Sequence, residues 1–232
     1  MKKIIAVIPA REGSKGLKLK NIKTINKKPL INFTIEEALK SKFISKVFLS
    51  TESNLIRSKT KQYKNLYHHF RPKYLAKDKI ETIDVILNLL SNLNEKFDYL
   101  ILLQPTCPLR TAEDIDVALK NLLNSNFDSI VSVCDVDGYH PYRMKIIKNG
   151  RLENFIKQKG ENMTPRQLLP KVYIRNGLIY ASKIKMILKN KSLVNGKVLP
   201  FVMSKLSSVN IDNEDDFYLA TRYLKKLKKK PR

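Results

Sequence analysis

Residues 3–9 read KIIAVIP, and residues 10–21, which follow directly, read AREGSKGLKLKN. The first stretch is apolar throughout and rich in β-branched residues, as is typical of a strand that is covered on both faces. The second stretch carries two glycines and four cations, and ligands of open α/β sheets bind beyond the carboxyl ends of strands. The pair therefore predicts an opening strand and a candidate binding loop, with an ordinary turn as the alternative.

Strand-like apolar segments alternate with helical patterns along the rest of the chain, which indicates an α/β fold with a mainly parallel sheet and helices on both faces. We expect further strands near residues 47–50, 65–70, 99–103, 128–133, 176–181 and 198–203. We expect helices at residues 29–42, 54–63, 81–93, from 111, at 183–189 and from 213.

The pattern changes between residues 138 and 175, where glycines, prolines and short alternating segments replace the strand–helix rhythm. This indicates a β-rich excursion from the sheet. With no internal repeat or linker, we expect residues 1–232 to form a single domain that carries this excursion.

The charge is strongly basic, at +24 from 45 Lys and Arg against 21 Asp and Glu. Residues 1–30 contribute nine cations and one acid, and residues 222–232 contribute seven cations and no acid. This balance favours anionic partners such as nucleotides, phosphosugars, nucleic acid or acidic lipid. The composition excludes collagen-like, low-complexity and wholly disordered chains, and no apolar run is long enough to insert in a membrane.

The cysteine usage bears on the cellular compartment. The chain has two cysteines, too few for a disulfide framework and without zinc-site spacing. Its N-terminal apolar run of seven residues, 4–10, meets Arg11 and Glu12 and not a small-residue cleavage site. We therefore expect a cytoplasmic protein.

Three further clusters carry chemistry. Residues 102–111 (LLQPTCPLRT) follow a predicted strand, and residues 165–180 join PRQLLP to NGLIY. Residues 209–212 read VNID, and in an extended segment Asn210 and Asp212 point to one face. Two oxygen ligands on one face suit Mg²⁺, which takes one or two carboxylates together with phosphate oxygens and water. Capping of the last helix by Asp212 or Asn213 is the alternative.

These motifs occur in one order: AREGSKG-LKLKN, FRPKYLA, LLQPTCPLRT, PRQLLP-x5-NGLIY and VNID-x3-DF. In that order they resemble the acylneuraminate cytidylyltransferases, the CMP-sialic acid synthetases and their relatives for legionaminate and pseudaminate. The resemblance covers residues 4 to about 224. It implies a Rossmann-like fold of the nucleotide-diphospho-sugar transferase type, and an enzyme of CMP-sugar biosynthesis for lipopolysaccharide or capsule. Such an enzyme joins CTP to an acidic nine-carbon sugar with Mg²⁺ and releases pyrophosphate.

The resemblance also implies roles for individual residues. Nucleotide binding falls to Arg11, Ser14, Lys15, Lys20, Asn21, Arg71 and Thr82. Sugar binding falls to Gln104, Arg143 (or Lys145), Arg166, Gln167 and Tyr180. Catalysis falls to Arg11, Lys20 and Asp212, and the metal to Asn210 and Asp212. Residues 138–175 correspond to a dimerisation excursion that reaches over the partner's site, so a homodimer is implied.

Two departures and two alternatives accompany this interpretation. The family usually has Asp-x-Asp where this chain has Asn210 and Asp212, from which we expect weaker Mg²⁺ binding or a shifted metal position. Glu12 adds a negative charge near the expected phosphates, with no evident reason in the sequence. A synthetase for the eight-carbon sugar Kdo is one alternative, although residues 11–17 lack the Arg-x-x-Ser-x-Arg-Leu-Pro pattern of that group. A basic nucleic-acid-binding protein is the other.

Overall fold

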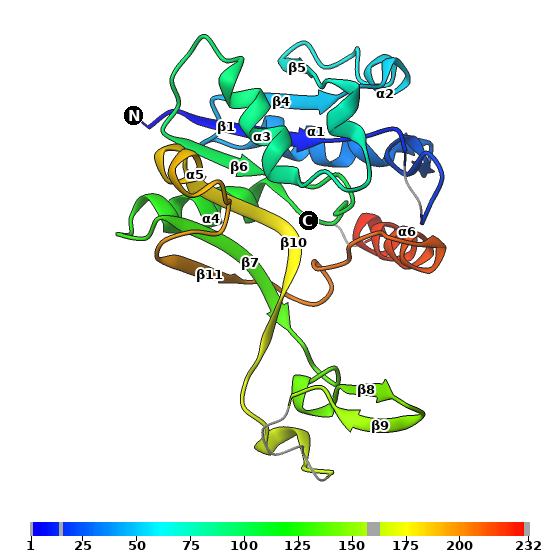
Figure 1. The fold of residues 1–232 in the computed structure, drawn as a ribbon. Coiled ribbons are helices and arrows are strands. Elements are labelled where there is room, and N and C mark those ends of the chain that lie inside the picture. Colours follow the sequence, from blue (N-terminus) through cyan, green and yellow to red (C-terminus); the bar gives the residue numbers. More distant parts are fainter. Residues whose placement is uncertain (1, 14–15, 157–162, 230–232) are drawn as a thin grey trace.

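A seven-stranded sheet forms the centre of the computed structural model, which describes residues 2–13, 16–156 and 163–229 (Figure 1). The strand order is β11-β7-β10-β6-β1-β4-β5, and β10 alone runs antiparallel to its neighbours within this sheet. The strands are β1 (Ile4–Pro9), β4 (Lys46–Thr51), β5 (Leu66–Phe70), β6 (Tyr99–Leu102), β7 (Ser129–Asp135), β10 (Tyr173–Lys183) and β11 (Val198–Val202). The predicted α/β fold with a mainly parallel sheet is confirmed.

Helices cover both faces of the sheet. They are α1 (Leu30–Lys40), α2 (Asn54–Ser58), α3 (Thr82–Ser91), α4 (Ala112–Leu123), α5 (Ile184–Asn190) and α6 (Glu214–Lys229). Along β1, Ile4, Ala6 and Ile8 pack with α1 and α4 on one face. The intervening Ile5 and Val7 pack with α3 and α5 on the other. Because side chains alternate along a strand, a segment that is buried on both faces must be apolar at every position, as residues 4–8 are.

The helix boundaries follow local hydrogen bonds. Thr111 caps α4 in a capping box with Asp114, as its sequence indicates. The prediction of a helix over residues 54–63 was too long, since α2 ends at Ser58. The hydroxyl of Thr60 donates to the carbonyl oxygen of Arg57 (3.0 Å), and Asn32 donates to that of Lys59 (3.4 Å). Side-chain bonds of this kind compete with helix continuation.

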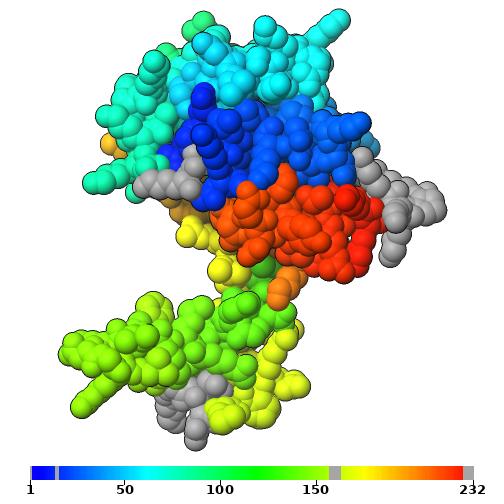
Figure 2. All heavy atoms as spheres, turned by 90° about the vertical axis from the view of Figure 1, so that its right-hand side faces the viewer, coloured from blue at the N-terminus to red at the C-terminus, as the bar shows by residue number. Residues whose placement is uncertain are grey.

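A smaller apolar cluster lies beside the main sheet and attaches α6 to the N-terminal segments. It joins Leu17 of the first loop and Leu109 of the loop after β6 to Val209 and Ile211. Ala220 and Leu224 of α6 cover it, together with residues near the short ribbon of β2 (Thr24–Ile25) and β3 (Lys28–Pro29). Figure 2 shows α6 against the N-terminal segments. The cluster thereby holds the first loop and residues 209–212 together.

The segment between β7 and β10 leaves the sheet as an arm (Figures 1 and 2). At the base of the arm, the first residues of β10 (Tyr173, Ile174 and Arg175) pair with the end of β7. It carries a hairpin of β8 (Lys145–Lys148) and β9 (Arg151–Asn154), every residue of which is exposed. The β-rich character expected for residues 138–175 is therefore present. In the part of the chain that the structure describes, no helix is both apolar and long enough to cross a membrane.

Arg110 fixes the loop after β6 although it is almost fully buried, with 2% of its surface exposed. Its guanidinium donates to the carbonyl oxygen of Leu178 on β10 (2.7 Å), to the Thr34 hydroxyl on α1 (2.8 Å) and to the carbonyl oxygen of Gln104 (3.3 Å). Burial lowers the pKa of this guanidinium. The side chain thus connects the loop to a strand and a helix.

Arg110→Met keeps the length of the side chain but removes the guanidinium donor to the carbonyl oxygen of Leu178 and one of the two side-chain donors to that of Gln104, which also accepts from the Thr34 hydroxyl (3.4 Å). Because each buried acceptor left unpaired costs about 1–3 kcal/mol, we expect the free energy of unfolding to fall by about 3 kcal/mol in urea titrations. Arg151→Met on the exposed β9 is the control and should change it by less than about 0.5 kcal/mol. Equal stability of the two variants would contradict this role of Arg110.

Candidate active site

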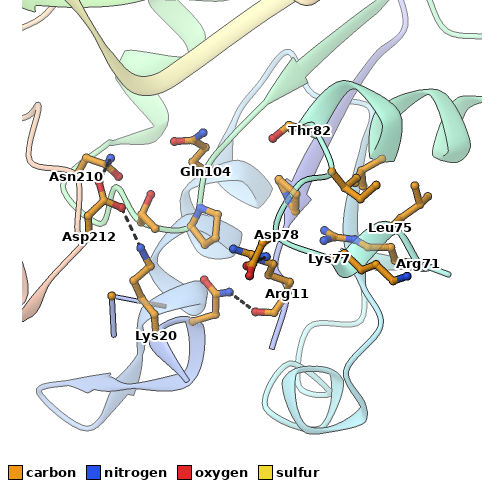
Figure 3. Close-up of a pocket in the computed structure, with 17 residues that line it drawn as sticks. Arg11, Lys20, Arg71, Leu75, Lys77, Asp78, Thr82, Gln104, Asn210 and Asp212 are labelled. Atoms are coloured by element: carbon orange, nitrogen blue, oxygen red, sulfur yellow. Dashed lines mark hydrogen bonds and ion pairs between the residues drawn. The ribbon is translucent and has the colours of Figure 1, made fainter. Parts of the chain in front are cut away.

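A cavity of about 640 Å³ opens at the carboxyl ends of β1 and β6, with Pro9 and Gln104 in its lining. The chain runs outward from β1 through β4 to β5 and then returns to the other side of β1 as β6. Ligands of open α/β sheets bind where the strand order reverses in this way. Figure 3 shows Lys20, Asn210 and Asp212 along one side of the cavity and Arg71 and Lys77 at the opposite side.

The two described cations of the first loop that line the cavity are both ion-paired. Lys20 donates to the Asp212 carboxylate (3.0 Å) and to the carbonyl oxygen of Ile211 (2.6 Å), and only 14% of its side chain is exposed. Arg11 donates to the carboxylate of Asp78 (2.7 Å) and to the carbonyl oxygen of Ala76 (3.3 Å). The expected residues Arg11, Lys20 and Asp212 therefore line one cavity. Ser14 and Lys15 lie outside the described residues.

The main chain around Asp212 is held from several sides. Ile211 donates its N–H to the carbonyl oxygen of Thr106 (2.9 Å), and Asp212 donates its N–H to Asp216 (2.9 Å). The carbonyl oxygen of Asp212 lies 2.3 Å from the place where a Cβ on Gly16 would stand. Only glycine permits this approach of the first loop to residue 212.

Asn213 and Asp216, not Asp212, cap the last helix. The Asn213 side chain accepts the N–H of Asp216 (2.9 Å), and the Asp216 carboxylate accepts the N–H of Asn213 (3.2 Å). The Asp212 carboxylate takes no part in this capping box, and 69% of its side chain is exposed. It accepts from Lys20 on one oxygen and from Asn210 on the other, both at 3.0 Å.

Arg71 and Thr82 line the part of the cavity opposite Asp212 (Figure 3). Arg71 is buried, and it donates to the carbonyl oxygen of Ser50 (2.8 Å) and to the Ser50 hydroxyl (3.3 Å) at the end of β4. Burial lowers the pKa of this guanidinium. Thr82 is the first residue of α3, so the amino end of that helix faces the cavity.

Within the first loop, Asn21 lines the cavity and Glu12 does not. Asn21 is buried and donates to the carbonyl oxygen of Arg11 (2.8 Å), while its own side-chain oxygen has no hydrogen-bond donor among the described residues. Glu12 turns away from the cavity and accepts from the hydroxyl of Ser53, the cap of α2. The Glu12 carboxylate, whose role was not evident from the sequence, therefore forms a hydrogen bond at the junction of β4 and α2.

The sequence did not identify the wall between β5 and α3, where Leu75, Lys77, Asp78 and Ile80 line the cavity. The motif FRPKYLA, residues 70–76, contains Leu75 and ends immediately before Lys77, and it is the available signal. Asp78 is the partner of Arg11. The described lining thus has four cations against two carboxylates, which favours an anionic ligand.

A second cavity of about 850 Å³ adjoins the first, because Gln104 and Asn210 line both. Tyr180 lies in its wall, as do Arg175 and Gly177 of β10. Gly177 has φ +81°, and a Cβ there would stand 2.8 Å from the side-chain oxygen of Gln104. The expected sugar-binding residues Gln104 and Tyr180 are therefore brought together, and Arg175 is a cation whose role the sequence did not identify.

The other expected sugar-binding residues lie in the arm and line neither cavity. Arg143 donates to the carbonyl oxygen of Thr164 (2.8 Å). Arg166 is paired with Asp137, and Gln167 lies beside it in a hollow of the arm. The alternative cation, Lys145, donates to the Asn154 side chain across the hairpin. One copy of the chain does not bring these residues to Gln104.

The donor set for a metal ion is small. The described residues contain no group of three or more His, Cys, Asp and Glu side chains that could hold one. Asp212 offers a carboxylate to the cavity. Asn210 turns its side-chain oxygen toward the thiol of Cys107 (3.6 Å) and its amide nitrogen toward Asp212. Burial raises the pKa of the Cys107 thiol, so the S–H stays protonated and donates.

Comparisons with known proteins identify a family. The family model described as "Cytidylyltransferase" matches residues 5–190. The CMP-N,N'-diacetyllegionaminic acid synthase of Legionella pneumophila is 33% identical over 96% of this chain and 96% of its own length. The N-acylneuraminate cytidylyltransferase of Streptococcus agalactiae serotype V is 31% identical over 93% of this chain, which spans only 52% of that enzyme.

The solved structures include one with a similar fold. A CMP:2-keto-3-deoxy-manno-octonic acid synthetase complexed with CTP superposes with a TM-score of 0.72 at 15% identity, covering 97% of this chain and 99% of that one. At this identity the likeness supports the fold alone.

The close approach of Gly16 to the backbone of Asp212 can be tested by substitution. Gly16→Ala places a methyl group against the carbonyl oxygen of Asp212 and separates the two sides of the cavity. Overpacking of this kind costs about 1–3 kcal/mol, so we expect the affinity for inorganic triphosphate with Mg²⁺ to fall about tenfold or more in calorimetric titrations.

Gly13→Ala is the matched control, because nothing lies within 4 Å of a Cβ at that position of the same loop. It should bind triphosphate like the unsubstituted chain. Equal affinities for the two alanine variants would show that the approach of Gly16 to residue 212 is irrelevant to binding.

Proposed function

The chain belongs to the cytidylyltransferase family, and on that premise we propose that it transfers the cytidylyl group of CTP to an acidic nine-carbon sugar. The products are a CMP-sugar and pyrophosphate. The observation that carries the proposal is the single cavity that brings Arg11 and Lys20 of the first loop to Asp212. Family membership and the fold are as the motifs predicted.

The first cavity suits a nucleoside triphosphate. Lys20 and Arg11 supply cations for the phosphates, and Ser14 and Lys15 complete the loop in our proposal. Arg71 and Thr82 are assigned to the nucleoside, since a guanidinium donor suits the acceptor edge of cytosine. The buried oxygen of Asn21, which lacks a donor among the described residues, is an acceptor for a ligand hydroxyl.

The second cavity suits the acidic sugar. It shares Gln104 with the first cavity, so a sugar held there lies beside the phosphates. Gln104 offers a donor and an acceptor to sugar hydroxyls, and Tyr180 adds a ring and a hydroxyl. Arg175, the cation of β10 that lines this cavity, can pair with the sugar carboxylate. The legionaminate and sialate enzymes named above support this class of substrate.

We assign the divalent cation to Asp212, whose carboxylate is exposed to the cavity and lies beside the proposed phosphates. One carboxylate fits Mg²⁺ that is held largely by the nucleotide, because Mg²⁺ takes one or two carboxylates and completes its shell with phosphate oxygens and water. Bound there, the cation would supply charge neutralisation on the phosphates.

The reaction is an in-line displacement at the α-phosphorus. The sugar hydroxyl oxygen forms a bond to that phosphorus, the bond to the bridging oxygen breaks, and pyrophosphate leaves. Lys20 and Arg11 stabilise the charge that develops on pyrophosphate. Asp212 accepts the proton of the attacking hydroxyl. Positioning and electrostatics therefore account for the rate, without a covalent intermediate.

A homodimer completes the site in this proposal. The arm residues Arg143, Arg166 and Gln167 do not reach Gln104 of their own chain, whereas an arm that crosses to a second copy would bring them near its sugar cavity. The hairpin exposes Ile147 and Leu152, at 79% and 69% of their surfaces, and these residues face each other across it. Exposed apolar pairs of this kind mark interaction surfaces.

A cytoplasmic location is also proposed, because Cys107 and Cys134 are both free. The CMP-sugar would then serve the assembly of lipopolysaccharide or capsule.

Pyrophosphate release tests the reaction. With CTP and Mg²⁺ we expect release with at least one of sialic, legionaminic and pseudaminic acids, and little with UTP or ATP. Chelation of Mg²⁺ and the Asp212→Ala substitution should abolish it. Release with Kdo alone would favour the eight-carbon alternative. No release with any acid, together with salt-sensitive binding of RNA or DNA, would favour the nucleic-acid alternative.

The oligomeric state tests the role of the arm. We expect the unsubstituted chain to sediment as a dimer and the Ile147→Glu, Leu152→Glu variant to sediment as a monomer, because two buried carboxylates would oppose association. Lys148→Ser, Arg151→Ser changes the neighbouring cross-strand pair on the other face of the hairpin and should remain dimeric. A monomeric unsubstituted chain would contradict the proposed assembly.

A further inference from the structure

The amide of Asn210 makes two directional hydrogen bonds that fix its orientation. Its oxygen accepts from the thiol of Cys107 at 3.6 Å, and its nitrogen donates to Oδ2 of Asp212 at 3.0 Å. A rotated amide would set its oxygen against a carboxylate oxygen, and two acceptors repel. Only one orientation therefore satisfies both neighbours.

This orientation settles the geometry of the Asp212 carboxylate. Asn210 donates to Oδ2, and Lys20 donates to Oδ1 at 3.0 Å. Each oxygen therefore has one protein donor and keeps acceptor capacity for the cavity. The main chain of Asp212 is already fixed by Asp216 and by the close approach of Gly16. With both oxygens and the backbone held, the carboxylate presents a defined edge to the cavity (Figure 3).

Cys107 lies behind the cavity wall and contacts the site through its neighbours. Its side chain is 1% exposed and lines neither the first cavity nor the second. The hydroxyl of Thr106, 3.9 Å from the sulfur, is its other hydrogen-bond partner among the described side chains, and Thr106 lines the first cavity. Of its two hydrogen-bond partners, Asn210 is the one whose side chain is bonded to the Asp212 carboxylate, so a change at Cys107 reaches that carboxylate through the amide of Asn210.

We propose that Asn210 is a positioning residue that donates to Asp212, that Cys107 orients its amide, and that Asn210 is not a ligand of the metal ion. The inference rests on the proposed function, in which Asp212 acts beside CTP and a divalent cation. It assigns the second position of the Asn-x-Asp motif to the cation and the first to the alignment of that carboxylate. The chain then replaces a second carboxylate with a neutral donor that does not repel the first.

If Asn210 were instead a ligand of the metal ion, Cys107→Ala would have a different effect on cation binding. If the Asn210 oxygen ligated the cation, the thiol would compete for that oxygen, and removal of the thiol would leave cation binding unchanged or tighter. If Asn210 is a donor to Asp212, removal of the thiol releases the amide and weakens the alignment. The sign of the effect of Cys107→Ala therefore separates the two assignments.

Side-chain amide NMR of the ligand-free protein tests the hydrogen bonds without any assumption about the reaction. The NH₂ signals of Asn210 are identified by their loss in Asn210→Ala. We expect them to shift in Asp212→Ala and in Cys107→Ala, and to return close to their original positions in Cys107→Ser, whose hydroxyl can donate in place of the thiol. Asn210 signals that shift in neither Asp212→Ala nor Cys107→Ala would overturn the proposal.

A double-mutant cycle tests the consequence at the cavity. The readout is the binding of Mn²⁺ in the presence of CTP, followed by the electron paramagnetic resonance of free Mn²⁺. We expect Asn210→Ala to weaken Mn²⁺ binding about tenfold, because hydrogen bonds to charged groups are stronger than those between neutral groups. We expect Cys107→Ala to weaken it about threefold, because the thiol affects Asp212 indirectly, through Asn210. Cys107→Ser should stay within about twofold of the unsubstituted chain.

The cycle also distinguishes positioning from a general packing defect. In the Asn210→Ala background, Cys107→Ala should have no further effect on Mn²⁺ binding, whereas a packing defect would weaken binding in both backgrounds. Unchanged or tighter binding in Cys107→Ala alone would overturn the proposal. Failure of the unsubstituted chain to bind CTP with Mn²⁺ would overturn the proposed function instead, and the amide signals would still report on the hydrogen bonds.

Discussion

The small apolar cluster of Leu17, Leu109, Val209 and Ile211 is the constraint on which the site depends. It lies outside the main core and joins three loops that are far apart in the sequence. Because α6 covers it, the packing of the last helix and the position of the first loop are coupled. Without this cluster the sheet would still have its two covered faces, but Lys20 of the first loop would have no fixed counterpart in Asp212.

Polar contacts then refine what the apolar cluster brings together. Gly16 allows the backbone of the first loop to touch residue 212, and Lys20 bridges to the carboxylate and to the neighbouring carbonyl oxygen. On the other side of the loop after β6, Arg110 secures the carbonyl of Gln104 from within the core. The result is a basic cavity with one aligned carboxylate, connected through Gln104 to a second cavity of suitable size for a sugar.

Much of this arrangement could be predicted from the sequence because it depends on local patterns. The uniformly apolar residues 4–8 identified a central strand, and the placement of basic and polar loops after strands identified Arg11, Lys20 and Gln104. The motif order further linked these loops to Asp212. The antiparallel direction of β10 could not be predicted, since it follows from the return path of the arm and not from the composition of that strand.

Other features depend on contacts between distant segments and therefore left no local signal. Asp78 follows an unremarkable turn, and its pairing with Arg11 arises only when β1 and the segment before α3 meet. The orientation of the Asn210 amide depends on Cys107, 103 positions earlier in the chain. The separation of Arg166 from Gln104 likewise depends on the direction of the arm, which a single sequence does not encode in any short motif.

A crystal structure of the protein with CTP and Mg²⁺ would show where the nucleotide binds. We expect the triphosphate between the first loop and residue 212, within hydrogen-bond distance of Lys20, and the cytosine on the side of Arg71. Nucleotide bound elsewhere, for example along the basic outer face of α6, with the Lys20–Asp212 pair left undisturbed and the cavity empty, would contradict this expectation.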